Sequence, residues 1–421
     1  MSDAAILMEI VLRSFVESDD FNGILLENAG ELAGLSGDDL RLVTKALIDQ
    51  AQVELSFEHH TGNPHIKRLP GLPPTEQIRA VLEDDLRGIC IYPSAAKISK
   101  HTDITLYDDR PYSKRLLLAE AQLIPVFFDL CVLERYMEDP RYSYDFSGFG
   151  GHISIEGPES ILRTQDQILI ESFGIGYDLN RHRVVVVYLR YLHKLTAEHQ
   201  QFWKSYQVSA SECKINSDIE RSAVLGAWPT NHSAYEALLY EQAEINNLSG
   251  LMGRPGLFKK TFENDRPRLF CPMLRPTGSS LDKFVHLLDK MLSENINKDF
   301  FRKDVALTED VQDASGVVVR TNRGTVKLLE CWLDRHYRSA DGERVGKEVV
   351  GSFQKIRLLR QKPAHAISKD TYDLALVRRQ DEVVGDAIHA LTKIRLIFSA
   401  HPSAGGYVAP EWLDSDRIVF Y

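Results

Sequence analysis

A proline at position 363 ends the clearest amphipathic pattern in this chain. The pattern covers residues 346–361 and gathers its charged side chains toward its end. Proline lacks a backbone N–H and disfavours helical geometry in the residue before it, so we expect the helix to stop here. The turn that follows carries His365, close in sequence to Arg360 and Lys362. These side chains can form a site, or they can simply cap the helix end.

The length and composition of the chain predict a soluble protein with more than one domain. A chain of 421 residues exceeds what one hydrophobic core usually serves, so we expect two or three domains. The composition, 43% hydrophobic and 26% charged, is that of a soluble globular protein. No apolar run approaches the ~18 residues that a membrane span needs, and the first residues lack the basic start of a signal peptide. We therefore expect a cytoplasmic protein without membrane contact.

The cysteines and histidines predict no metal site. The five cysteines are odd in number and widely spaced, and they form no CxxC motif. His59, His60 and His65 cluster in a turn, but they lack nearby cysteines and the helical spacing of metal-binding histidine pairs. We expect no bound metal and no cofactor, and a reducing cytoplasm suits the free thiols.

Residues 1–95 predict a small winged-helix-like domain. Helical patterns over residues 4–16 and 39–48 come first. The alternating segments 53–57 and 66–69 follow, with a glycine-containing turn between them, and they predict a β-hairpin. Helices followed by a hairpin resemble a winged-helix module.

The charges of this domain argue against DNA binding. Its second helix begins with Asp38 and Asp39 and carries only Arg41 and Lys45 as cations, with Lys67 on the predicted wing. Because phosphate contacts dominate the affinity of such domains for DNA, acidic residues at the helix start oppose tight binding. Contact with a protein, or a purely structural use, is therefore favoured for this domain.

Residues 96–272 predict a central mixed α/β block without a recognisable site. Arg115–Met137 is interpreted as one long apolar helix, kinked at Pro125. The segments 167–173 and 183–191 predict neighbouring strands, and the second contains four consecutive valines that suit burial on both faces of a sheet. No phosphate-binding glycine loop occurs in this block.

Residues 273–402 predict a four-helix bundle, and 403–421 a short tail. A proline-rich linker precedes the bundle. Helical patterns follow at 281–295, 326–337, 346–361 and 373–398. The chain as a whole is therefore expected to be a multidomain α+β protein.

The four helices, together with Arg360-Gln-Lys-Pro-Ala-His365 near the end of the third, resemble the HEPN superfamily. Many of its members are metal-independent ribonucleases with an Arg-x(4–6)-His signature. The resemblance, which covers the C-terminal bundle alone, implies that Arg360 and His365 are catalytic. It also implies that Arg357, Gln361 and Lys362 contact nucleic acid. Gln361 stands where Asn, Asp or His is more frequent.

The resemblance implies an endoribonuclease that leaves a 2′,3′-cyclic phosphate and needs no cofactor. An imidazole can transfer protons at neutral pH, and a guanidinium can bind the phosphate while remaining charged. Members usually dimerise so that two Arg–His pairs face one cleft, which implies RNA as a partner and a homodimer through the bundle. By analogy with the family, such a protein suits bacterial stress responses, toxin action or phage defence.

Two other interpretations remain open. Arg360 can cap the carbonyl groups of its own helix, in which case the bundle is a non-catalytic HEPN-like module that binds a nucleotide or a partner. The N-terminal domain can instead make the chain a winged-helix regulator. The same spacing occurs again at Arg395 and His401, at the end of the fourth predicted helix. The spacing alone therefore does not select a site.

Overall fold

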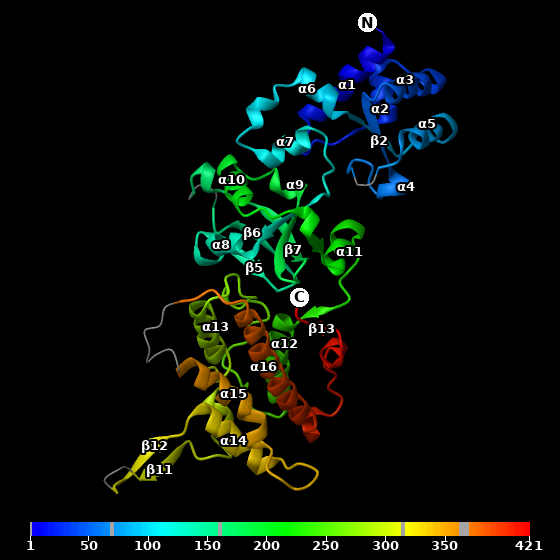
Figure 1. Cartoon of the computed structure of the whole chain (residues 1–421). Helices are drawn as coiled ribbons and strands as arrows, with labels where there is room; N and C mark the ends of the chain where they lie inside the picture. Colours follow the sequence, from blue (N-terminus) through cyan, green and yellow to red (C-terminus); the bar gives the residue numbers. More distant parts are fainter. Residues whose placement is uncertain (1, 68–70, 159–161, 313–315, 362–369) are drawn as a thin grey trace. The chain divides into compact units, whose positions relative to one another are not determined.

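The computed structural model describes residues 2–67, 71–158, 162–312, 316–361 and 370–421 (Figure 1). The chain is mixed α+β, as its sequence predicts. It divides into two compact units, of which unit 1 comprises Met1–Tyr144 and His152–Gly226, and unit 2 comprises Asp145–Gly151 and Ala227–Tyr421.

Unit 1 begins with helices packed around a small antiparallel sheet of strand order β1-β3-β2. The side chain of Ser2 caps the first helix by accepting a hydrogen bond from the backbone N–H of Ala5. Val11, Leu47 and Ile91 belong to the apolar core between helices and sheet. The elements are α1 (Asp3–Glu17), β1 (Ile24–Leu25), α2 (Leu26–Ala33), α3 (Gly37–Asp49), β2 (Val53–Phe57), α4 (Glu58–Thr61), α5 (Pro74–Glu83) and β3 (Ile89–Pro93).

The predicted pairing of residues 53–57 with 66–69 is wrong for the residues that the structure describes. Strand β2 pairs with β3 instead, with Leu55 opposite Ile91, and Ile66 and Lys67 lie in no strand. All five residues of β3 are buried. An apolar strand that can be buried is a better partner than a segment containing consecutive charges, because sheet pairing is stabilised mainly by packing of side chains.

Gln122, which is buried, joins this N-terminal part to the rest of unit 1. Its Oε1 atom accepts a hydrogen bond from the backbone N–H of Lys67 at 2.7 Å, and its Nε2 atom donates to the carbonyl of Phe21 at 3.2 Å. Residues 1–95 therefore share unit 1 with the sheet that follows them.

A six-stranded sheet follows, and all of it except residues 145–146 of β5 and 150–151 of β6 belongs to unit 1. Its strands follow the order β4-β8-β7-β6-β5, and β9 pairs with β7. The valines at 184–187 are buried in β8, where the sequence predicts a strand. The elements are α6 (Ala95–His101), α7 (Pro111–Leu117), β4 (Pro125–Asp129), α8 (Glu134–Glu138), β5 (Tyr142–Phe146), β6 (Gly150–Ile155), β7 (Ile170–Asp178), β8 (Arg183–Tyr188), α9 (Leu189–Leu192), α10 (Ala197–Ser205), β9 (Cys213–Ile215) and α11 (Ser217–Leu225).

The predicted long helix Arg115–Met137 is wrong, because a strand interrupts it. Helix α7 ends at Leu117, and Ala119 adopts a left-handed backbone conformation with φ of 58°. Strand β4 then begins at Pro125 and pairs with β8. Proline is tolerated at the first residue of an edge strand, and the valine and phenylalanines after it favour strands. The apolar character of this run indicates burial but does not distinguish a helix from a strand.

Unit 2 is built on helices that share one apolar core (Figure 1). The long helix α16 packs along α12 and also contacts α15, which in turn contacts α13 and α14. The elements are β10 (His232–Ser233), α12 (Ala234–Leu251), α13 (Gly278–Met291), β11 (Thr308–Gln312), β12 (Val318–Asn322), α14 (Thr325–His336), α15 (Gly346–Gln361), α16 (Ala375–Ser399) and β13 (Ile418–Val419).

The core of unit 2 contains more than the four predicted helices. Helices α13 to α16 correspond to them, but α12, from within the predicted central block, contributes Leu238 and Ile245 to the same core. The tail also belongs to this unit, because β13 pairs in parallel with β10 and Trp412 stacks on His232. No helix in the described part of the chain is long and apolar enough to cross a membrane.

Candidate functional site at the end of helix α15

Arg360 lies in the last turn of α15 and connects this helix to the end of α13. Its Nη1 atom donates a hydrogen bond to Oδ2 of Asp289 at 2.7 Å and also donates to Oε1 of Glu294. Asp289 lies in the last turn of α13, and Glu294 follows three residues after that helix ends. Among the described residues, no carbonyl group of α15 accepts a hydrogen bond from the Arg360 side chain.

The two carboxylates differ in burial. The Asp289 side chain is fully buried, whereas the Glu294 side chain is 40% exposed. A buried carboxylate is costly unless a cation and hydrogen bonds compensate for its lost hydration. Arg360 supplies the positive charge and a hydrogen bond to Oδ2, while Oδ1 of Asp289 is buried without a hydrogen-bond partner in the described ranges, so we expect Arg360 to stabilise the packing of α13 against α15.

Arg360, in the last turn of α15, and Glu294 each stabilise the ionised form of the other. The hydrogen bond from Arg360 lowers the pKa of Glu294, and the positive charges of Arg360, Lys290 and Arg357 lower it further. Hydrogen bonds to Glu294 and Asp289 raise the pKa of Arg360. The guanidinium and the Glu294 carboxylate are therefore both ionised at neutral pH.

Only one of the three guanidinium nitrogens of Arg360 is used in this arrangement. Within the described ranges, its Nε and Nη2 atoms have no hydrogen-bond or ion-pair partner. The side chain also remains 30% exposed. Within the described ranges the guanidinium is thus anchored through Nη1, and the donors on Nε and Nη2, which lie in one plane, suit bidentate binding of a phosphate.

The other residues predicted for this site are only partly described. Arg357 is half-buried one turn before Arg360, and Gln361 is exposed at the end of the helix. Lys362 and His365 lie outside the described residues. The structure therefore brings Arg357 and Arg360 to one helix end, and the pairing of Arg360 with His365 stays a prediction.

Arg395, which begins the second Arg-to-His spacing, lies inside the core of unit 2. Its Nε atom donates to Oε2 of Glu241 at 2.8 Å, its Nη2 atom to Oδ1 of Asp414 at 2.6 Å, and its Nη1 atom to Oδ2 of Asp414 at 3.2 Å. Its side chain is 2% exposed. Arg395 joins α12 and α16 to the C-terminal tail, and no donor nitrogen is left over for a ligand.

Asp289 and Glu294 are absent from the set of site residues predicted from the sequence. A signal for Asp289 is nevertheless present, because it lies on the apolar side of its helix with Val285 and Leu288. A charged residue on an apolar helix face requires a buried partner of opposite charge. The sequence does not reveal which of the many arginines supplies that charge.

Neither metal-binding clusters in the described ranges nor comparisons with known proteins give further information about this site. No group of three or more His, Cys, Asp or Glu side chains in the described ranges is arranged to hold a metal ion. Comparisons of the chain with family models, curated proteins and solved structures find no match.

Proposed function

We propose that the helical part of unit 2 is a HEPN-like, metal-independent endoribonuclease in which Arg360 binds the phosphate at the cleavage site. The observation that carries this proposal is the state of the Arg360 side chain. One nitrogen is fixed to the buried Asp289, while two nitrogens have no partner in the described ranges and the side chain is partly exposed.

An anchored guanidinium supports catalysis because its position does not have to be fixed during the reaction. Donors that are already oriented toward developing negative charge stabilise a transition state by typically about 3–4 kcal/mol. Asp289 acts as a positioning residue, because its carboxylate accepts a hydrogen bond from Nη1 and so holds the guanidinium in place. Arg357, one turn earlier, is proposed to add a phosphate contact, together with Gln361 and Lys362.

His365 is proposed to transfer the protons. RNA cleavage to a 2′,3′-cyclic phosphate requires a base that removes the 2′-hydroxyl proton and an acid that protonates the departing 5′-oxygen. One imidazole cannot perform both tasks in the same step unless a second group assists it. The proposal therefore includes a homodimer through the helical part of unit 2, in which a second copy supplies the second histidine.

The proposal predicts a specific product. Purified protein should cut single-stranded RNA in the presence of EDTA and leave 2′,3′-cyclic phosphate ends. His365→Ala should reduce the rate by roughly 10²–10⁴-fold, the usual contribution of general acid–base catalysis. Lys355→Ala serves as the control, because Lys355 is an exposed cation on the same helix, paired with Asp386. Cleavage that requires a divalent cation, or an active His365→Ala variant, would contradict the proposal.

A protein-binding role for the N-terminal part is the second candidate. Helices α1 to α3 beside a small antiparallel sheet support this role, although in the described ranges β2 pairs with β3 and not in the hairpin that the winged-helix resemblance implies. Two of its cations are already engaged, because Arg41 donates to the carbonyl of Val81, and Lys67 pairs with Glu54 and donates to the carbonyl of Ala119. These contacts favour a protein partner over DNA. Salt-sensitive binding of the full chain to duplex DNA would contradict this role.

A further inference from the structure

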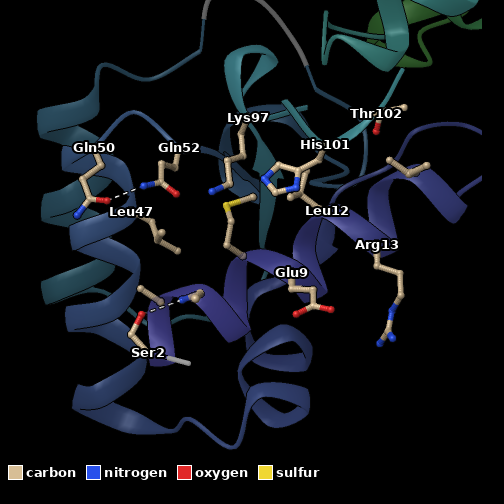
Figure 2. A pocket seen from close by; sticks show the side chains of 14 residues that line it. Ser2, Glu9, Leu12, Arg13, Leu47, Gln50, Gln52, Lys97, His101 and Thr102 are labelled. Carbon is tan, nitrogen blue, oxygen red and sulfur yellow. Dashed lines mark hydrogen bonds between the residues drawn. The ribbon is translucent and has the colours of Figure 1, made fainter. Parts of the chain in front are cut away.

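A groove of about 760 Å³ lies in unit 1 between α1, the end of α3 and α6 (Figure 2). This volume is within the ~300–1,000 Å³ range of small-molecule sites in proteins. The groove is independent of the site at the end of α15, which belongs to unit 2. Its lining combines apolar residues of α1 and α3 with polar residues of α6 and of the segment that follows α3 (Figure 2).

The floor of the groove is apolar. One face of α1 contributes Ala5, Leu12 and Val16 to the open surface, while Met8 of α1 and Leu47 of α3 support it from the core, where they are 2% and 1% exposed. Val16 is 38% exposed, although most apolar side chains of α1 are buried in the core. The small alanine side chains near the start of α1 keep the groove open. An apolar molecule that covered this surface would gain about 25 cal/mol for each Å² removed from water.

The rim of the groove carries a cation that has no protein partner. Lys97 of α6 is half-buried, and within the described ranges its side chain makes neither a hydrogen bond nor an ion pair. The side chain of His101, one turn later, also lacks such a partner in the described part of the chain. A lysine that lines a groove without a protein carboxylate beside it can pair with an anion that a ligand brings. The surroundings of Lys97 therefore suit an anionic ligand.

Amide groups stand beside this cation. Gln52 donates a hydrogen bond to Gln50 at 2.6 Å, and Figure 2 shows Lys97 between Gln52 and His101. Figure 2 also shows Arg13 directed away from Lys97 and Gln52. Lys97, His101 and the two glutamines are thus the polar groups that can meet the head group of a ligand, above an apolar floor.

The charges of the lining favour a ligand with one negative charge. Of the lysine and arginine side chains that line the groove, Lys97 lies beside Gln52 and His101, whereas Arg13 is directed away from them. A monoanion balances the single positive charge of Lys97. A dianion at the same place would keep one negative charge without a cation beside it.

We propose that this groove binds an amphipathic monocarboxylate. Its carboxylate pairs with the Lys97 ammonium and accepts a hydrogen bond from His101. Its apolar body lies on Ala5, Leu12 and Val16. The N-terminal part of unit 1 is thereby a small-molecule sensor, whatever the activity of unit 2.

Titration calorimetry of the full chain with three probes tests the proposal. Decanoate carries both recognised features, 1-decanol keeps the apolar chain without the charge, and acetate keeps the carboxylate alone. We expect decanoate to bind at least tenfold more tightly than either of the other two. Equal binding of decanoate and 1-decanol, or no binding of decanoate, would overturn the proposal.

Variants of the groove locate the binding. Lys97→Met should weaken decanoate binding about tenfold or more, and Ala5→Trp should abolish it by filling the groove. Lys100→Met is the matched control, because Lys100 is exposed on the same helix and does not line the groove. Circular dichroism confirms that each variant is folded. Unchanged binding to folded Lys97→Met would contradict the assigned site.

The same variants also distinguish a ligand site from a contact between copies. Light scattering reports the mass of the wild type and of folded Ala5→Trp without ligand. The proposal predicts the same mass for both proteins. A dimeric wild type that becomes monomeric on Ala5→Trp substitution would assign the groove to a second copy and overturn the carboxylate site.

Discussion

Arg360 and Arg395 begin the same sequence spacing but occupy opposite situations in unit 2. Arg395 donates from all three nitrogens to Glu241 and Asp414 and is 2% exposed. Within the described ranges Arg360 donates from Nη1 alone, and its side chain is 30% exposed. Each arginine faces one fully buried carboxylate, Glu241 or Asp289. The difference shows that one spacing of residue types can place an arginine in a fully paired core cluster or at a partly exposed helix end.

The pKa of the buried Glu241 carboxylate further distinguishes the two arginines. Burial raises the pKa of Glu241, although the hydrogen bond and charge of Arg395 act in the opposite direction. Arg395 therefore offsets the cost of burying the Glu241 carboxylate within the helix core. Arg360 offsets the cost of burying Asp289 with one nitrogen, and in the proposed function its other donors bind RNA. We therefore expect Arg395 to contribute to stability, and Arg360 to contribute to both stability and RNA binding.

Removal of Arg395 should produce the largest loss of stability. Arg395→Met leaves Glu241 buried without its cation, and breaking such a buried pair costs about 3–5 kcal/mol. Thermal unfolding measures this loss. Arg378→Met is the control, because Arg378 is 88% exposed on the same helix and should change the free energy of unfolding by less than about 0.5 kcal/mol. Equal stability of the two variants would show that the Arg395 cluster is not structural.

Neutralising Asp289 should affect both stability and RNA cleavage. Asp289→Asn keeps the shape of the side chain but weakens its hydrogen bond to Arg360, which we expect to cost about 1–3 kcal/mol. Arg360 keeps its hydrogen bond to the partly exposed Glu294 but is held less firmly, which should lower the cleavage rate about tenfold, equivalent to about 1.4 kcal/mol. Parallel measurements of unfolding and cleavage test this expectation.

Asp386→Asn is the matched control for Asp289, since Asp386 is an exposed acid paired with Lys355. It should leave both quantities unchanged. An Asp289→Asn variant that loses stability but cleaves RNA at the wild-type rate would remove Asp289 from the positioning role.

Glu294 should have the smallest effect, and that effect should depend on pH. Arg360 lowers the pKa of Glu294 in the folded state below its ordinary value of 4.5, so the ion pair stabilises the fold above that pH. The stabilisation is lost as the pH falls through the lowered pKa. Because both partners are partly exposed, Glu294→Gln should cost less than about 1 kcal/mol at pH 7. A cost that persists at pH 2 would contradict an ionic origin.

Helices that combine a clear period with a strong stop signal are the best-predicted parts of this fold. The pattern over 346–361 predicts α15 at its observed bounds, Gly346–Gln361. The four valines from 184 likewise predict β8. In both cases local geometry and burial indicate the same element, so the prediction does not depend on knowing the partner.

Elements that depend on a distant partner are the ones predicted wrongly. Strand β2 pairs with β3, more than thirty residues later in the chain, because β3 is fully apolar and the nearer segment is not. Strand β4 resembles a helix in its apolar character and becomes a strand beside β8. The site shows the same limit, since Asp289 meets Arg360 only through the packing of two helices that lie far apart in the sequence.

The rate of RNA cleavage by Arg360→Lys shows whether the guanidinium of Arg360 binds the phosphate at the cleavage site. Lysine keeps the positive charge near Asp289 but lacks the planar fork of donors that binds phosphate. In EDTA, under single-turnover conditions, we expect a loss of roughly 10²-fold or more relative to the wild type. Arg378→Lys should cleave normally. If folded Arg360→Lys cleaves RNA as fast as the wild type, the unused donors of Arg360 have no catalytic role and the account is wrong.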